Sequence, residues 1–139
     1  MVFKQPDTKE FEQVKQLVEE LWLDNETMQP EQFRVLSDDG KVIAFGRLRE
    51  YEDSTELCSI GVAKEFQKRG FGDKMVKHLI GIADRDVYAV TVEPDFFAKM
   101  GFHKVNSYPD SLKHKVELCT KEYHVDRPYF AMKWEKKQI

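Results

Sequence analysis

Cysteine is scarce in this sequence: only Cys58 and Cys119 occur among 139 residues. Two cysteines so far apart form no disulfide framework, which favours a reducing compartment. The histidines show no metal-ligand spacing either, so the sequence predicts no metal site. The histidines are His78, His103, His114 and His124.

Long apolar runs and excess positive charge are also missing. No stretch is apolar enough to span a bilayer, and residues 1–20 mix charged with apolar residues instead of forming the core of a signal peptide. We therefore expect a cytoplasmic protein without membrane contact. A net charge of −3 argues against general nucleic-acid binding, which needs a positive surface.

The chain nevertheless has ample material for a core. Apolar residues make up 41% of it, including ten phenylalanines. A length of 139 residues suits one domain, so we predict a single domain over residues 1–139. Its one basic segment is 64–77, with five basic residues against two acidic ones.

Local patterns predict a mixed α/β fold. Asp7 and Glu10 resemble a capping box that opens a helix fraying near Asn25, and the polar turn at residues 37–40 predicts a hairpin between strands 33–36 and 41–51. The remaining periodicity gives a strand at residues 2–5, then strand 56–63, helix 72–84, strand 87–92, helix 95–100, strand 103–105, helix 111–119 and strand 129–135. This order indicates the α/β class with a mixed sheet.

The basic segment joins a strand to a helix. The strand ends in Gly61 and Val62, and Gly70 and Gly72 then allow close approach of the backbone at the start of a helix. Such a turn can grip a pyrophosphate. The dinucleotide-binding fingerprint is excluded, since Met75 stands in place of its third glycine. From these residues alone, an ordinary turn with solvated lysines remains an equal alternative.

The string "QKRGFG", Gln67 to Gly72, resembles the Q/R-x-x-G-x-G/A motif of the GNAT acetyltransferase superfamily, and it follows a strand ending in "SIGVA". "FFAKMGFHKV", Phe96 to Val105, is similar to a later segment of that family. The resemblance implies a mostly antiparallel sheet with splayed central strands, flanking helices, and acetyl-CoA as cosubstrate of an N-acetyltransferase. The cofactor-binding residues that it implies are Ile60, Gly61, Val62, Gln67, Lys68, Arg69, Gly70, Phe71, Gly72, Asp73 and Phe97.

The C-terminal third shows a narrower resemblance. "YPDSLKHKVELC" and "PYFAMKW" are similar to segments of N-acetylglutamate synthase-like single-domain acetyltransferases, as is "TVEPDFF". Val92 stands where those proteins often have a second threonine, and their further cysteine near the place of Glu122 is absent. This resemblance implies a small-molecule amine as acceptor, with an acidic amino acid such as glutamate as the candidate. A homodimer stays open.

Two residues are candidates for catalysis. Glu56 lies six residues before Val62, a spacing similar to that of the catalytic glutamate in the histone-acetylating branch of the family, so it is a candidate general base. The alternative is a solvated residue at a strand edge. Phe97 stands where many relatives have a tyrosine that protonates the departing thiolate, so we assign that role to Tyr108, with His103, Cys58 or solvent as alternatives. Without a donor, the chain would be a noncatalytic acyl-CoA-binding module.

Basic residues offer a place for the acceptor's carboxylate. Arg47 and Arg49 alternate along one face of a strand, and Lys113 and Lys115 are two residues apart near the C-terminus. Arginine can bind a carboxylate through a paired fork. We predict Arg47, Arg49 and Lys113 as substrate-binding residues, against the alternative of solvated surface charge.

Overall fold

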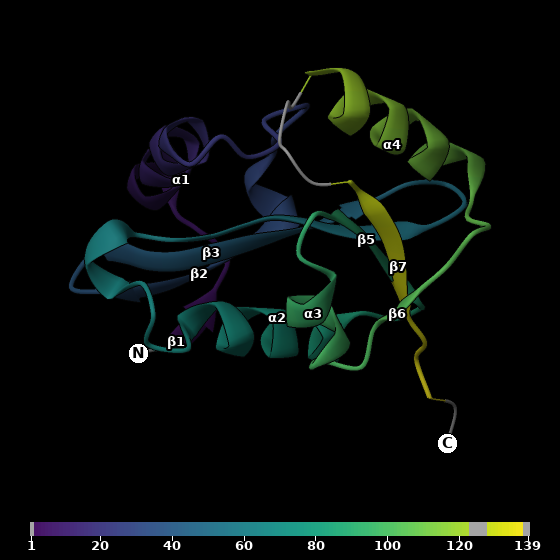
Figure 1. The fold of residues 1–139 in the computed structure, drawn as a ribbon. Coiled ribbons are helices and arrows are strands. Elements are labelled where there is room, and N and C mark those ends of the chain that lie inside the picture. Colours follow the sequence, from purple (N-terminus) through teal and green to yellow (C-terminus); the bar gives the residue numbers. More distant parts are fainter. Residues whose placement is uncertain (1, 123–127, 138–139) are drawn as a thin grey trace. The chain divides into compact units, whose positions relative to one another are not determined.

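The computed structural model describes residues 2–122 and 128–137 (Figure 1). The elements follow the predicted order. They are β1 Val2–Lys4, α1 Thr8–Glu20, β2 Phe33–Asp38, β3 Lys41–Glu50, β4 Thr55–Val62, α2 Phe71–Ile82, β5 Val87–Thr91, α3 Pro94–Ala98, β6 His103–Lys104, α4 Asp110–Glu122 and β7 Phe130–Trp134. Two short 3₁₀ turns, Pro30–Gln32 and Lys64–Phe66, were not predicted. None of the described helices is long and apolar enough to cross a bilayer.

The strands form a sheet in the order β1-β2-β3-β4-β5-β7-β6. Antiparallel ladders join β1 to β2, β2 to β3, β5 to β7 and β6 to β7. β4 and β5 run parallel, with a ladder of two residue pairs, Thr55 with Val87 and Glu56 with Tyr88. The predicted class, a mixed and mostly antiparallel sheet with flanking helices, is confirmed, and the short parallel ladder agrees with splayed central strands.

The chain divides into two compact units, one made of residues 1–49 and 57–82, the other of residues 50–56 and 83–139. Strand β4 contributes to both, because the boundary falls after Glu56. A single domain over residues 1–139 stays a prediction, and the units are described one at a time.

The first unit begins with the predicted capping box. The Glu10 N–H donates to Asp7 Oδ1 at 2.8 Å, and the Asp7 N–H donates to Glu10 Oε1 at 3.0 Å. The helix ends at Glu20, earlier than predicted, and its cap residue Leu21 bonds back to Leu17. Asp39 and Gly40 form the hairpin turn, with φ of 51° and 80°, because two positive φ values suit the twist of the flanking strands.

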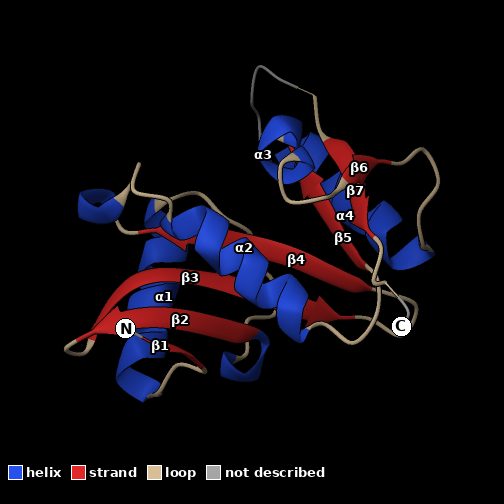
Figure 2. Ribbon diagram, turned by 90° about the horizontal axis from the view of Figure 1, so that it is seen from below, coloured by secondary structure: helices blue, strands red, loops and turns tan. Residues whose placement is uncertain are grey.

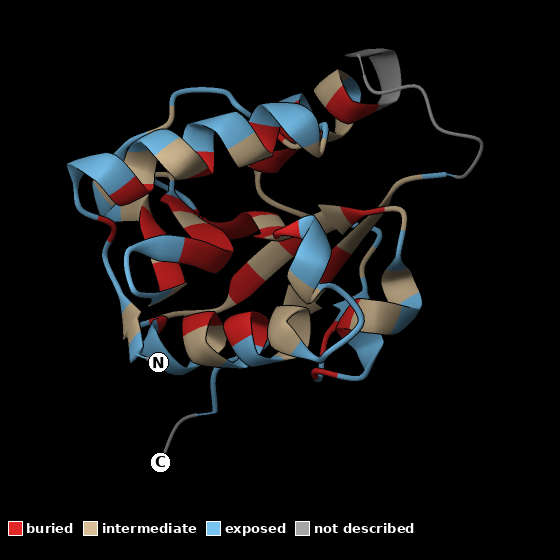
Figure 3. Ribbon diagram, turned by 90° about the vertical axis from the view of Figure 1, so that its left-hand side faces the viewer, coloured by how far each residue is buried: buried red, intermediate tan, exposed pale blue. Residues whose placement is uncertain are grey.

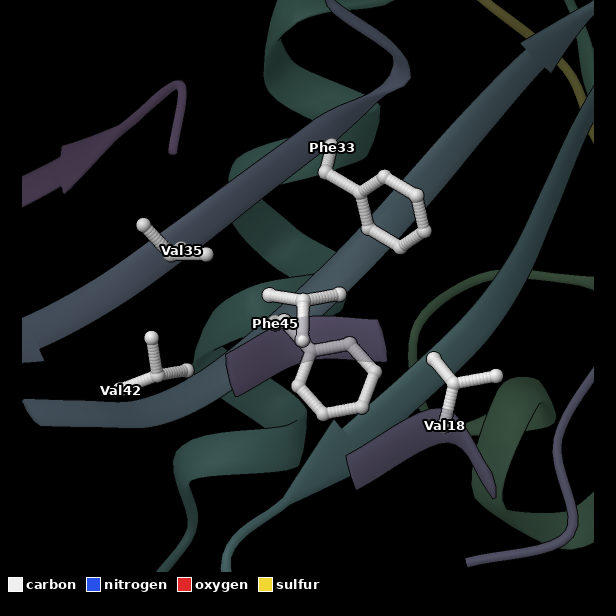
Figure 4. Close-up of a cluster of buried hydrophobic side chains, with 6 residues drawn as sticks. Val18, Phe33, Val35, Val42 and Phe45 are labelled. Atoms are coloured by element: carbon white, nitrogen blue, oxygen red, sulfur yellow. The ribbon is translucent and has the colours of Figure 1, made fainter. Parts of the chain in front are cut away.

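Helices cover both faces of the strands in the first unit, α1 on one side and α2 on the other (Figures 1 and 2). On the α1 side, buried aliphatic and aromatic side chains form the core shown in Figure 4. They are Val14, Val18, Phe33, Val35, Val42 and Phe45. On the α2 side, a Cβ on Gly46 would lie 2.6 Å from Leu79 and 2.7 Å from Ile60, so only glycine allows this close packing. The alternation of Phe45 and Gly46 thus gives each helix its own contact surface.

In the second unit, β7 lies between β5 and β6, and its Met132 is buried. Phe97 and Phe102 pack edge to face, with ring centroids 5.2 Å apart. Helix α3 ends at Ala98 with Lys99 as its cap, earlier than the predicted end at residue 100, and Gly101 follows with φ of 96°. The burial pattern agrees with this packing, since the strands are mostly buried and the helices carry their exposed residues on the outside (Figure 3).

Arg85 fixes the turn between β3 and β4. Its Nη2 donates to the carbonyl oxygens of Tyr51 at 2.6 Å and Ser54 at 2.7 Å, and its Nε donates to Thr55 Oγ1 at 2.8 Å. One guanidinium therefore holds the segment that leads to Glu56.

His78 on α2 stacks on Phe3 of β1, with ring centroids 4.3 Å apart and planes at 9°. Burial lowers the pKa of His78, and the charge of Arg34 lowers it further. A lowered pKa in the folded state means that the unfolded chain takes up the proton first as the pH falls. Stability from this contact is therefore complete above the unfolded pKa of about 6.5 and decreases below it.

We predict that lowering the pH from 7.5 to 5.5 reduces the free energy of unfolding less in the variant His78→Phe than in the original chain. The phenylalanine preserves the ring stack but takes up no proton. Urea unfolding at both pH values measures this. Equal pH dependence in the original chain and His78→Phe would contradict the assignment.

Candidate active site

The loop between β4 and α2 has a defined left-handed geometry. Lys68 and Gly70 adopt φ values of 65° and 83°, and Gln67 to Gly70 are exposed. A Cβ on Gly70 would meet no atom within 4 Å. Glycine is therefore favoured at this position by the backbone conformation and not by crowding.

The loop leads directly into the N-terminus of α2. The Lys74 N–H donates to Gly70 O at 3.1 Å, the first bond of the helix. The preceding N–H groups, those of Phe71, Gly72 and Asp73, belong to the first turn, which has no intrahelical acceptors. Such a turn binds phosphate groups.

Positive side chains surround this turn. Lys68 and Arg69 are exposed, and the Arg69 guanidinium lies 5.5 Å from the Phe66 ring centroid. Lys41 approaches the same ring at 5.5 Å and pairs with Glu65 at 2.7 Å. Binding of the pyrophosphate of an acyl-CoA by the segment 67–73 stays a prediction, for a loop that is exposed and basic.

Strand β4 contains an irregularity just before the predicted pantetheine-binding residues. Ser59 has φ of 53°, which is unusual for a non-glycine residue in a strand. Its hydroxyl donates to Asp24 O at 2.7 Å and accepts from Arg47 Nη2 at 3.2 Å. Ile60, Gly61 and Val62 follow directly, and their pairing with pantetheine stays a prediction.

Glu56 is fully buried, so the alternative of a solvated residue at a strand edge is wrong. Its Oε2 lies 2.7 Å from Lys115 Nζ, and its Oε1 accepts from the Tyr51 hydroxyl at 2.9 Å. Both charged side chains are at most 5% exposed. The catalytic role of Glu56 stays a prediction, now for a carboxylate held in a buried ion pair.

Lys113 and Lys115 differ in their surroundings. The side chain of Lys113 is 62% exposed and pairs with Asp110 at 2.9 Å, a contact that raises the pKa of Lys113. Its binding of the acceptor stays a prediction. Residues two apart on a helix point in nearly opposite directions. The helical spacing thus already required only one of these lysines to face the interior, and the structure shows that it is Lys115.

Arg47 and Arg49 do share one face of β3, and both are buried. Arg49 donates to both carboxylate oxygens of Asp24, at 3.1 and 3.3 Å, and Arg47 bonds to the carbonyl oxygens of Asp24 and Glu26, both at 2.9 Å. The alternative of solvated surface charge is wrong for these two residues. Their binding of an acceptor stays a prediction.

Two further predicted residues belong to the second unit. Phe97 is 8% exposed and packs edge to face on Phe96 and Phe102. Tyr108 is half-buried in the segment between β6 and α4. Contact of Phe97 with the cofactor and proton donation by Tyr108 stay predictions. Cys58 and Cys119 are buried.

A pocket of about 800 Å³ lies in the second unit. Its charged lining residues are three acids and three bases, so the pocket favours neither anions nor cations. Together with two uncharged residues, the lining is Asp53, Ser54, Asp84, Arg85, Asp86, Tyr88, Lys136 and Lys137. It includes none of the predicted site residues.

The sequence matches the acetyltransferase (GNAT) family over residues 3–106. The chain therefore belongs to this family, as an acyl-CoA-dependent N-acetyltransferase with acetyl-CoA as cosubstrate. No curated protein sequence matches it significantly.

Solved structures show the same fold. The N-acetylglutamate synthase from Neisseria gonorrhoeae, complexed with coenzyme A and N-acetyl-glutamate, is 17% identical with a TM-score of 0.78. The match covers 99% of this chain but 35% of the synthase, so this chain spans about a third of that protein. Rv2747 from Mycobacterium tuberculosis, in complex with CoA and NLQ, is 21% identical with a TM-score of 0.76 over 99% of this chain and 100% of that one. The ribosomal-protein-S18-alanine N-acetyltransferase from Escherichia coli is 15% identical, with a TM-score of 0.66 over 99% and 95% of the chains.

The left-handed conformation of Gly70 generates a prediction about CoA binding. A side chain at φ near 83° costs about 1–2 kcal/mol and will shift the loop backbone. Gly70→Ala should therefore bind CoA at least about tenfold more weakly by calorimetry, a loss of about 1.4 kcal/mol. Gly40→Ala is the matched control, since Gly40 has φ of 80° and also nothing within 4 Å of its Cβ. It should lose similar stability and keep its CoA affinity. Equal CoA affinity in the two variants would contradict the assignment.

The ion pair of Glu56 generates a second prediction. Glu56→Gln leaves the Lys115 ammonium buried without its carboxylate and should cost about 3–5 kcal/mol of unfolding free energy. Adding Lys115→Met to the same chain should recover most of it, because both charges are then gone. Urea unfolding measures both effects.

Turnover of the double variant separates a catalytic from a structural Glu56. If Glu56 is the general base, turnover stays about 10²–10⁴-fold low although stability returns. Recovery of turnover together with stability would assign the pair a purely structural role.

Proposed function

We propose that the chain transfers the acetyl group of acetyl-CoA to the α-amine of a small acidic amino acid, with glutamate as the first candidate. The exposed, left-handed loop at the N-terminus of α2 carries the cofactor part of this proposal. Cytoplasmic location and a homodimer remain predictions from the sequence.

The reaction needs a base that accepts a proton from the amine and a donor that protonates the leaving thiolate. The neutral amine attacks the acetyl carbonyl carbon, the new C–N bond forms, and the C–S bond breaks to release the thiolate of CoA. The amine loses one proton and the thiolate takes one up. Glu56 is the proposed acceptor of the amine's proton, and Tyr108 is the proposed donor to the thiolate.

Support for a carboxylate-bearing acceptor comes from the buried basic residues. Arg49 already binds a carboxylate through both Nη atoms, which is the geometry by which arginine recognises this group. A polyamine or a lysine side chain would bring positive charge toward two buried guanidiniums and be repelled by them.

The relatives support the same class of acceptor. Three structures with TM-scores above 0.75 were solved with an additional ligand besides CoA, which is N-acetyl-glutamate, NLQ or L-arginine. Their low identities show the fold alone, so the acceptor is carried over here as part of the proposal.

A screen of acceptors tests the proposal. We expect release of free CoA thiol from acetyl-CoA to depend on the acceptor, with glutamate exceeding spermidine and a lysine peptide by at least about tenfold in kcat/KM. Mass spectrometry of the product should find an added acetyl group on the α-amine.

Two results would contradict it. Faster reaction with spermidine or the peptide than with every free amino acid would exclude an amino-acid acceptor. Binding of CoA without thiol release from any amine would point instead to the noncatalytic binding module.

A further inference from the structure

The fork between Arg49 and Asp24 is a complete carboxylate-recognition contact inside the protein. Nη1 of Arg49 lies 3.1 Å from Asp24 Oδ2, and Nη2 lies 3.3 Å from Asp24 Oδ1. The two side chains are 9% and 5% exposed. Paired N–H···O bonds of this kind are how arginine binds a free carboxylate from solution.

Arg47, two residues earlier, has a different set of partners. Its Nη atoms bond to the carbonyl oxygens of Asp24 and Glu26, to Gln32 Oε1 at 3.2 Å and to Ser59 Oγ. Its guanidinium also lies 5.2 Å from the Phe33 ring centroid. Nη2 of Arg47 also lies 3.6 Å from Asp24 Oδ1, so both arginines pair with this carboxylate. Only Arg49 holds it through two hydrogen bonds, one to each oxygen.

The segment that supplies Asp24 is a loop without regular structure between α1 and the 3₁₀ turn at Pro30. Trp22 and Thr27 within it have φ values of 58° and 50°. Each such residue is strained by about 1–2 kcal/mol. Trp22 is also 85% exposed, so packing of its ring does not offset this strain. The hydrogen bonds to the arginines therefore hold the loop against this backbone strain, and without them we expect the loop to relax.

Among the described residues, buried positive charges outnumber the buried negative charges near Arg49. Charged side chains less than a tenth exposed are Glu10, Asp24, Arg47, Arg49, Glu56 and Lys115. Glu10 pairs with Lys4 at the surface, at 3.1 Å. Glu56 and Lys115 pair with each other in the second unit, and the first unit is left with one carboxylate, Asp24, and two cations, Arg47 and Arg49. Because buried charge is costly without compensation, an incoming carboxylate would be favoured.

We propose that the Arg49 fork recognises a carboxylate of the acceptor and that Asp24 is its internal competitor, which makes Asp24 the residue that sets the affinity for the acceptor. This inference rests on the proposed function, in which the acceptor carries a carboxylate. Acceptor binding then exchanges one carboxylate for another on the same guanidinium, and the loop around Asp24 is released.

Asp24→Asn tests the competition. The amide preserves the shape of the side chain and the bond from the Glu26 N–H, 2.8 Å from Oδ1, but it carries no charge for the fork. We expect KM for glutamate to fall by about three- to tenfold, because the competitor is weaker. CoA affinity should not change. Asp38→Asn, which removes the same charge at an exposed position on the β2–β3 hairpin, should leave KM unchanged.

Arg49→Lys tests the fork. It keeps the charge and loses the paired geometry, so KM for glutamate should rise by at least about tenfold while CoA affinity stays the same. If Asp24→Asn does not fold, Arg49→Lys still tests whether the Arg49 fork recognises the acceptor's carboxylate. An unchanged KM in Arg49→Lys, or a raised KM in a folded Asp24→Asn, would overturn the proposal.

Acceptor analogues identify the carboxylate and add a control. Glutamine lacks the γ-carboxylate and glutamate α-amide lacks the α-carboxylate, so the effect of Asp24→Asn should vanish for one of the two. Persistence of the full effect with both amides would show that the fork recognises neither group.

Glutarate separates this inference from the proposed function, since it carries carboxylates and no amine. We expect it to protect the protein from thermal unfolding, more strongly in Asp24→Asn and more weakly in Arg49→Lys. If glutamate is not acetylated but glutarate behaves in this way, the proposed reaction fails and the carboxylate site stands. If glutamate is acetylated with the same KM in all variants, the proposed reaction stands and the carboxylate site at Arg49 fails.

Discussion

The guanidinium of Arg47 is fully buried and bonds to segments that are distant in the sequence. Its partners lie in the loop after α1, in the 3₁₀ turn before β2 and in the middle of β4. Removing the guanidinium would take a charge-assisted hydrogen bond from each of these groups, at about 1.5–3 kcal/mol per bond. The loop that carries Asp24, the Arg49 fork and the left-handed Ser59 all depend on this one cation.

Strand β4 links this network to the chemistry. Glu56 lies near its start, Ser59 breaks its regularity in the middle, and its end leads into the loop with Lys68 and Gly70. Three residues between positions 59 and 70 thus have positive φ, and strain of this kind persists only where the surroundings determine it. Hydrogen bonds hold Ser59, whereas the exposed loop has few partners of its own. A ligand that bonds to the loop backbone would therefore stabilise a conformation that the chain already adopts.

The predictions from sequence succeeded where the signal was local. The capping box of Asp7 and Glu10 and the turn at Asp39 and Gly40 each depend on neighbouring residues, so the pattern determines the structure. The partners of Glu56 and Arg49 could not be read in this way. Asp24 meets Arg47 across 23 residues and Ser59 across 35, and nothing in a local pattern states which polar groups will meet. Helical spacing does predict that Lys113 and Lys115 point in different directions, but it does not tell which of them is buried.

Buried charges argue for a function more strongly than for stability. Well-packed apolar residues in place of a buried ion pair are often neutral or stabilising by about 1–4 kcal/mol. Arg49, Asp24, Glu56 and Lys115 are therefore poor choices for a core that needs only to be stable. They suit a protein that must place an ionised carboxylate and a carboxylate-binding fork away from water, where their interactions are strongest. On this argument, the pair contributes little net stability, so the variant Glu56→Gln/Lys115→Met should differ from the original chain in activity more than in stability.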